Sequence, residues 1–133
     1  MARFGADPDR AVYDRLLENI GGGVLRPVEL GPIVTTEGMG IGAVWGDYDN
    51  DGDLDLLLGG ACWTGRTTRT DIFRNDGGIF VKGEYGFHGI ASGTVSWADY
   101  DNDGDLDIIT NNIDDPAFLF ENTLYTKDTK KDK

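Results

Sequence analysis

Two identical nine-residue strings hold the residues of this sequence that are best suited to chemistry. Residues 47–55 and residues 99–107 both read Asp-Tyr-Asp-Asn-Asp-Gly-Asp-Leu-Asp, and the second string follows the first by 52 residues. Carboxylates at every second position repel one another, and a chain tolerates that density when a cation lies among them. Calcium takes about six to eight oxygen ligands. The strings therefore predict two divalent-cation sites, most simply for calcium.

Alternate side chains of a tightly turning loop can converge on one point, so positions 1, 3, 5 and 9 are expected to supply carboxylate ligands. Gly52 and Gly104, at position 6, are expected to take a positive φ that allows a sharp bend. Asp53 and Asp105, at position 7, would offer their backbone carbonyls and keep their side chains for water or an outer partner. The predicted carboxylate ligands are Asp47, Asp49, Asp51 and Asp55 in the first copy, and Asp99, Asp101, Asp103 and Asp107 in the second.

Other metal motifs fit the strings less well. An EF-hand needs a bidentate acid at position 12, where this chain has Leu58 and Thr110, and a dockerin-type loop fails for the same reason. Magnesium demands tighter octahedral geometry, and zinc prefers Cys and His ligands, which neither string contains. The alternative is a pair of solvated acidic turns without an ion, which the repetition disfavours. We expect a structural metal, because the ligands saturate the ion and no nucleophile or base stands nearby.

The strings are expected to connect short β-strands. Trp45 and Trp97 stand two residues before the first aspartate of each string, and the apolar runs 56–58 and 108–109 follow the last. Short apolar runs closed by turn residues indicate strands, because they are too short for helices. The turn at 75–78 predicts a hairpin. One unit is thus four strands, at about 41–46, 54–59, 70–75 and 79–83.

The repeat divides the chain into an N-terminal segment, two units and a tail. Residues 117–122 echo the first strand of the hairpin, so the second unit follows the plan of the first. The predicted segments are 1–40, a first unit at 41–91, a second unit at 92–126 and a charged tail at 127–133.

The N-terminal segment has two possible structures. Residues 16–29 resemble the hairpin of the repeat, which would make them the last two strands of a preceding unit. A helix is the alternative, with Asp7 as its cap and Val12, Leu16 and Ile20 four residues apart before a glycine. We favour the hairpin because it matches the repeat.

Length and charge narrow the classes of function. The chain has 133 residues, enough for one compact domain, and a formal net charge of −12. This acidity argues against nucleic acid or an anionic membrane surface as partner. Cys62 is the only cysteine, so no intrachain disulfide forms, and no segment is apolar enough for membrane insertion. Residues 1–8 lack the apolar core of a signal peptide, which predicts an intracellular protein or an internal piece of a secreted one.

The pattern Trp-Gly-Asp-Tyr-Asp-Asn-Asp-Gly-Asp-Leu-Asp at 45–55, with Phe-Arg-Asn-Asp-Gly-Gly-Ile-Phe at 73–80, resembles FG-GAP/VCBS repeats. The resemblance covers residues 40–125 strongly and 13–30 weakly. It implies four-stranded antiparallel blades of a β-propeller, like the integrin α-subunit head, with calcium in the loop between the first two strands. It also implies that Trp45 and Trp97 pack between blades. Carried over by residue, it gives two sites: Asp47, Asp49, Asp51, Asp53 and Asp55, and Asp99, Asp101, Asp103, Asp105 and Asp107.

The chain departs from this family in length. Closed propellers have about four to eight blades, and this chain has two to two and a half. Uncovered blade faces would be apolar, so we expect self-association or a place in a longer chain. The resemblance further implies an extracellular or cell-surface location, where free calcium is high.

The function predicted first is a non-enzymatic calcium-binding scaffold for adhesion or protein–protein interaction. The loop 59–70 is a candidate contact surface, with Trp63, Arg66 and Arg69 as residue types common in interfaces. One alternative is a glycan-binding module, with Trp63 or Tyr85 as a stacking platform. Another is a fragment of a propeller-based polysaccharide-active enzyme, against which stand a single histidine and the lack of a nucleophile motif.

Overall fold

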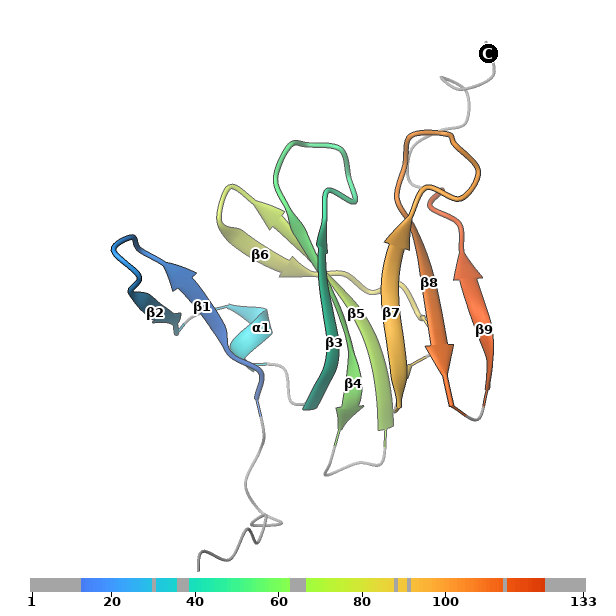
Figure 1. Cartoon of the computed structure of the whole chain (residues 1–133), viewed down its shortest axis with the longest axis horizontal. Helices are drawn as coiled ribbons and strands as arrows, with labels where there is room; N and C mark the ends of the chain where they lie inside the picture. The colour runs from blue at the N-terminus through green and yellow to red at the C-terminus, as the bar shows by residue number, and fades with distance from the viewer. Residues whose placement is uncertain are drawn as a thin grey trace, which may run out of the picture.

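Antiparallel β-sheets make up nearly all of the regular structure (Figure 1). Among the residues that the computed structural model describes, a two-stranded, a four-stranded and a three-stranded sheet follow one another along the chain. The predicted all-β fold class is confirmed. The described residues are 13–29, 31–35, 39–62, 67–87, 89–90, 92–113 and 115–123.

The N-terminal segment forms a hairpin of strands β1 (Leu16–Asn19) and β2 (Leu25–Val28). The predicted hairpin is therefore what the structure shows for residues 16–28, while Asp7 and Val12, where a helix would begin, lie outside the described residues. A four-residue helix, α1 (Pro32–Thr35), follows, which the sequence did not predict. Across the described ranges, no helix has the length and apolar character required to cross a membrane.

The four-stranded sheet is a meander of adjacent strands in chain order. Its four strands match the predicted ones, but the second and third are longer at their shared end. Backbone pairing continues through Gly59 and Gly60, which face Thr70 and Arg69. The predicted contact loop 59–70 is therefore wrong in extent, and only residues 63–66 remain between the strands. The strands are β3 (Met39–Gly46), β4 (Asp55–Cys62), β5 (Thr67–Asp76) and β6 (Ile79–Lys82).

The three-stranded sheet repeats the first three strands of this plan. It contains β7 (Gly93–Ala98), β8 (Asp107–Asn112) and β9 (Asp115–Phe120). A fourth strand, which the plan of the first unit would place after residue 123, and the charged tail at 127–133 lie outside the described residues.

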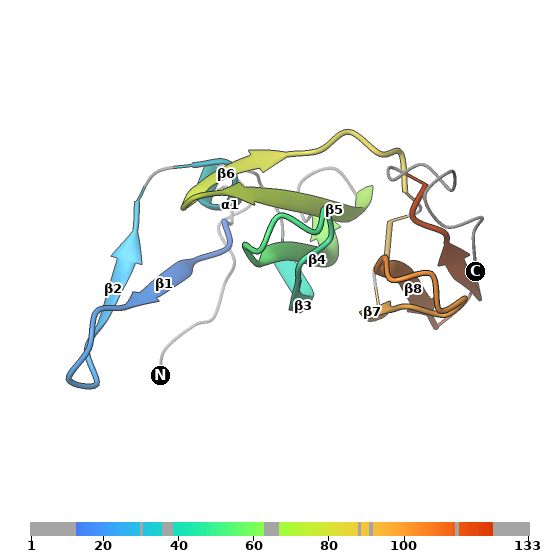
Figure 2. The ribbon, with the colours of Figure 1, turned by 90° about the horizontal axis from the view of Figure 1, so that it is seen from above.

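The two larger sheets pack against each other, with β3 lying beside β7 (Figure 2). Leu57 and Ile72 of the first sheet are fully buried and cluster with Val95 and Ile108 of the second. Trp97 lies in this interface, where its indole N–H donates to the Val44 carbonyl oxygen of β3 at 3.3 Å. One apolar core therefore joins the two repeat units.

The opposite face of the four-stranded sheet has its own core. Leu56, Leu58 and Phe73 cluster there with Ile33 of α1, and Leu16 of β1 packs against them. The leucine run of β4 is thus buried on both faces, which explains its continuous apolar character. Trp45 also belongs to this face, but 47% of it is exposed. Trp97, by contrast, is partly buried between the two larger sheets.

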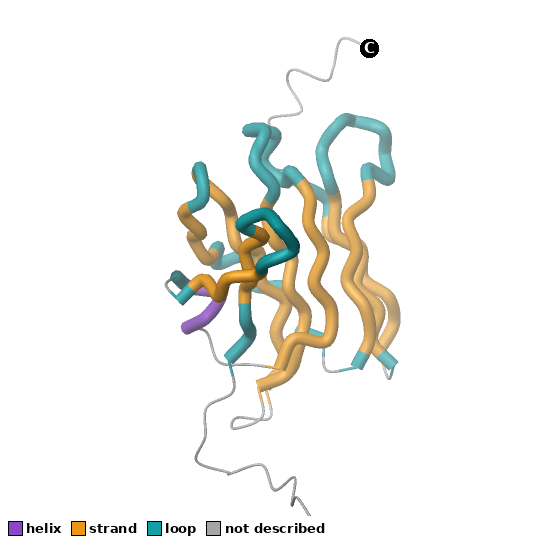
Figure 3. Tube along the Cα trace, turned by 60° about the vertical axis from the view of Figure 1, so that its left-hand side comes forward, coloured by secondary structure: helices purple, strands orange, loops and turns teal. Residues whose placement is uncertain are grey.

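Both aspartate loops project from the same end of the stacked sheets. One loop joins β3 to β4 and the other joins β7 to β8 (Figure 1), and Figure 3 shows teal loops above the upper ends of the strands. The shared end follows from the matching strand directions of the two sheets, which lie side by side. The fold therefore brings together two strings that are 52 residues apart in the chain.

Candidate metal centre

Each aspartate loop bends at the same two positions. Asn50 has a φ of 59° and Gly52 a φ of 93°, while Asn102 and Gly104 have 58° and 94°. The predicted positive φ of both glycines is confirmed. Asparagine is one of the few other residues that tolerate this left-handed region. The local sequence thus imposes one loop shape on both copies.

Backbone N–H groups hold the carboxylates on the inner side of each loop. The Asp47 carboxylate accepts from the backbone N–H groups of Asp51 and Gly52, both at 3.0 Å. Asp49 accepts from the Asp51 N–H at 3.3 Å. The second loop repeats these bonds at the same distances, with Asp99 in the place of Asp47. Positions 1 and 3 therefore face the same space in both loops.

The ninth-position aspartate closes each loop from the start of the following strand. Asp55 is fully buried, and its two oxygens accept the backbone N–H of Tyr48 (2.7 Å) and that of Asn75 (2.8 Å). Asp107 is equally buried, and it accepts from the backbone N–H groups of Tyr100 at 3.1 Å and Asn122 at 2.8 Å. Each closing carboxylate thus ties its loop to the end of the third strand of its own sheet.

Three carboxylates converge in each loop. In the first copy, oxygens of Asp47, Asp49 and Asp55 all lie within 4.8 Å of one another. In the second copy, the corresponding oxygens of Asp99, Asp101 and Asp107 do the same. Two oxygens bound to one calcium at about 2.3–2.6 Å lie at most about 5.2 Å apart. The spacing and the all-oxygen donor set therefore fit calcium.

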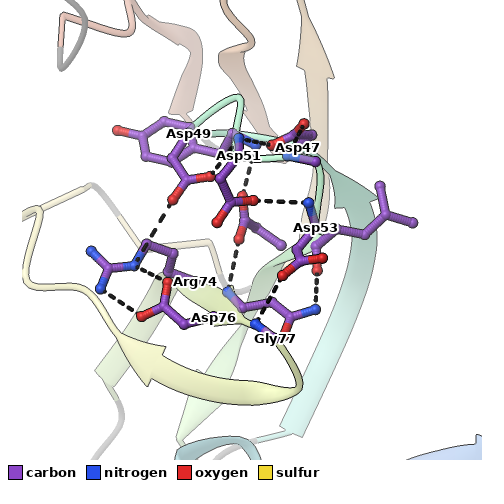
Figure 4. Close-up of polar contacts among 12 residues, drawn as sticks. Asp47, Asp49, Asp51, Asp53, Arg74, Asp76 and Gly77 are labelled. Atoms are coloured by element: carbon purple, nitrogen blue, oxygen red, sulfur yellow. Dashed lines mark hydrogen bonds and ion pairs between the residues drawn. The ribbon is translucent and has the colours of Figure 1, made fainter.

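The carboxylates at positions 5 and 7 lie outside these two convergent groups. Asp51 lies in a further group of carboxylates, with Asp49 and Asp76. Asp53 accepts the backbone N–H of Gly77 at 2.8 Å and so anchors the β5–β6 turn to the loop (Figure 4). Among the described residues, the convergent groups contain none of the predicted ligands Asp53, Asp103 and Asp105.

Asp105 has a different partner from its counterpart Asp53. It is buried, and its carboxylate accepts the side-chain amide N–H of Asn50 at 2.8 Å. The second loop is therefore hydrogen-bonded directly to the first. For Asp53 and Asp105 alike, the side chain binds a partner outside the convergent group, as expected for position 7.

Two charged residues beside the first loop were not predicted from the sequence. Asp76 and Arg74 come from the β5–β6 hairpin, and Figure 4 shows both next to the loop. Arg74 donates to Asp76 at 2.8 and 3.0 Å, and its Nε lies 3.9 Å from an Asp49 oxygen. The Asn-Asp-Gly-Gly turn was a signal for these positions, because a tight turn points its side chains toward the same end as the loop.

Burial and mutual repulsion disfavour the charged form of several loop carboxylates. Burial, and then the charges of Asp55 and Asp51, raise the pKa of Asp49 above its ordinary value. Burial also raises the pKa of Asp55, against the opposing effect of its backbone N–H donors. The pKa of Asp101 is raised in the same way, by desolvation and by the Asp103 charge. A bound cation would relieve this cost, because it favours the charged form of each carboxylate.

The residues proposed for partner contact are placed differently from expectation. Arg69 lies within β5 with 10% of its side chain exposed, and it pairs with Asp14 and Asp71. The prediction that Arg69 is an exposed contact residue is therefore wrong, because β5 begins earlier than predicted. Trp63 and Arg66 lie outside the described residues.

Tyr85 is also unsuited to act as an open stacking platform. It packs edge-on against Tyr48, with ring centroids 5.9 Å apart, and stacks on Phe87 at 5.3 Å. The cavity beside it holds about 190 Å³, below the 300–1,000 Å³ or so of usual ligand pockets.

Comparison with protein-family models, curated proteins and solved structures finds no match to this chain. The membership of the chain in a family therefore stays a prediction from its motifs. Among the described residues, the donor set consists of carboxylate oxygens and backbone groups, which are donors that could hold a hard cation.

Proposed function

We propose that this chain is a calcium-binding β-repeat module of the FG-GAP/VCBS type, in which each larger sheet is a propeller blade. The observation that carries the proposal is the convergence of three carboxylates, one of them fully buried, at the same place in both repeats. One acidic loop could be an accident of the surface. Two loops with the same internal hydrogen bonds argue that each loop binds the same kind of ligand.

The calcium would be structural. It would join the end of β3 to the start of β4 through Asp47, Asp49 and Asp55, with Asp51 and backbone or water oxygens completing its shell. The matching residues of the second loop would do the same. An ion that binds only the folded chain stabilises it by mass action, about 2.7 kcal/mol at a hundredfold excess over Kd. The module would then act where free calcium is high, outside the cytoplasm.

The arrangement of the sheets supports the blade assignment. Both larger sheets are meanders, their first strands lie side by side, and their acidic loops point the same way. Leu57 and Ile72 of the first sheet are buried beneath the second sheet. Their counterparts Ile109 and Leu119 in the second sheet are 37% and 46% exposed. A further blade, from another copy or a longer chain, would cover them in the same way.

A scaffold for adhesion or protein–protein interaction is the role that this arrangement supports best. The metals would stiffen one end of the blades, and that end would present a fixed surface. Stiff end loops on a rigid scaffold are a common place for binding sites.

The test is a calorimetric calcium titration combined with thermal unfolding in calcium and in chelator. We expect two ions per chain, and a melting temperature that rises with calcium and falls with chelator. The Asp47→Asn, Asp49→Asn double variant should bind one ion. Glu84→Gln, an exposed acid outside both loops, should bind two and serves as the charge control. A melting temperature that ignores calcium would refute the proposal.

A further inference from the structure

A continuous path of hydrogen bonds joins the two closing aspartates. The Tyr48 backbone N–H donates to Asp55 at 2.7 Å, and the Tyr48 carbonyl accepts the side-chain amide of Asn122 at 3.1 Å. The Asn122 backbone N–H then donates to Asp107 at 2.8 Å. All four residues are buried, with exposures of 5% or less. Two residues, Tyr48 and Asn122, thus separate the closing carboxylate of one loop from that of the other.

Two further contacts cross between the loops at the same place. Asn50 of the first loop donates to Asp105 of the second at 2.8 Å. The Tyr48 ring packs on Trp97 of the second sheet, with ring centroids 5.4 Å apart. Neither loop can therefore change the position of its closing aspartate without moving residues that the other loop uses.

We propose that the two calcium sites are thermodynamically coupled, so that an ion in either loop raises the affinity of the other. This inference rests on the proposed function and adds a regulatory property to it. The element that both ions would act on is the joint made by Tyr48 and Asn122 between the sheets.

We expect the coupling to be positive, because both ions order the same residues. The first ion fixes its closing aspartate, and this fixes the backbone of Tyr48 or Asn122. The second ion then meets a closing aspartate that is already held, so the ordering cost is met once for both sites. Repulsion between the two ions acts in the opposite direction, but the carboxylates around each ion reduce it. By linkage, the factor must be the same in both directions.

The experiment follows calcium binding at each loop separately in the intact chain. The amide resonances of Gly52 and Gly104 report the two loops, because each N–H donates to the position-1 carboxylate of its own loop. Single-site chains come from two double variants, Asp47→Asn with Asp49→Asn, and Asp99→Asn with Asp101→Asn. We expect each remaining site to bind calcium about fivefold more weakly than in the intact chain, a modest value for coupling between sites.

Three further variants test the path itself. Asn122→Ala removes the bond to the Tyr48 carbonyl, while its backbone bond to Asp107 stays. Asn50→Gly removes the other polar link and keeps a residue suited to the φ of 59°. Both should reduce the factor toward one. Asn75→Ala is the matched control, because Asn75 holds the same place in the first sheet but donates to Leu54 within it.

The possible failures are distinct. If both glycine resonances respond to calcium and the affinities are independent, the coupling is wrong and the proposed function stands. If Asn75→Ala lowers the factor as much as Asn122→Ala does, the path through Asn122 is wrong. If neither resonance responds, the calcium sites themselves are refuted. If Asn122→Ala does not fold, the coupling factor of Asn50→Gly alone tests the links between the loops. This variant should fold, because Asn50 is exposed in its loop.

Discussion

The closing aspartate of the first loop, Asp55, offers the strongest test of how the loop is held. Its buried carboxylate accepts two backbone N–H groups, one on each oxygen, from Tyr48 and Asn75. Asparagine has the same shape but only one acceptor oxygen, so in Asp55→Asn one N–H would face an NH₂ group. A buried donor that loses its acceptor costs about 1–3 kcal/mol.

An opposing effect reduces this cost. Burial raises the pKa of Asp55, so the ionised carboxylate is itself unfavourably desolvated in the absence of a cation. The neutral amide of asparagine does not carry this cost of burying a charge. We therefore expect Asp55→Asn to lower the free energy of unfolding in chelator by about 1–2 kcal/mol. For a chain of this length, about 3–4 °C per kcal/mol gives a fall of about 3–8 °C in melting temperature.

The assay is thermal unfolding followed by circular dichroism, in chelator and in calcium. Asp51→Asn is the matched control, because it makes the same charge change in the same loop at an exposed carboxylate. It should change stability in chelator by no more than about 0.5 kcal/mol. In calcium, Asp55→Asn should lose further stability along with the ion. If the parent and Asp55→Asn melted together in chelator, the backbone bonds would not be what anchors the loop.

Three other predictions test the packing, the charges and the exposed face. In Gly59→Ala, the new Cβ would lie 2.4 Å from Ile90 Cδ1 in a buried site, so we expect a loss of about 1–3 kcal/mol in urea unfolding; unchanged stability would mean that the sheets pack more loosely. Arg74→Gln removes a guanidinium 3.9 Å from Asp49 and should strengthen calcium binding at the first loop alone, by about two- to fivefold at low salt; calorimetry that finds no change would show that Arg74 does not compete with the ion. Leu119→Ser should reduce the mass measured by light scattering at high concentration, and a parent chain that stays monomeric would contradict association through this face.

Local signals in the sequence were enough to locate the strands and the loop shape. The apolar runs and turn residues predicted all four strands of the first unit, and Gly52 and Gly104 have the positive φ that the bend required. These features depend on residues within one turn or one strand. They therefore need no knowledge of the rest of the fold.

The wrong predictions concern residues whose positions are decided by tertiary packing. Gly59 and Gly60 suggested the end of a strand, yet β4 continues to Cys62. At Gly59 the absent side chain leaves room for Ile90, which a Cβ would meet at 2.4 Å. Arg69 was expected on a surface, but the longer strand places it in a partly buried ion pair with Asp14. Neither contact is visible in the local sequence, because each joins residues far apart in the chain.

The two loops show which structural features an identical local sequence determines. Their internal bonds agree in length, so the nine residues alone set the places of the carboxylates at positions 1 and 3. The aspartate at position 7 has the same sequence neighbours in both loops but different spatial neighbours: Asp53 accepts the backbone N–H of Gly77 in its own hairpin turn, and Asp105 accepts the side-chain amide of Asn50 in the other loop. The two loops should thus bind the same kind of ion with different affinities. The first loop is hydrogen-bonded within its own sheet through Asp53, and the second is hydrogen-bonded across the joint between the sheets through Asp105.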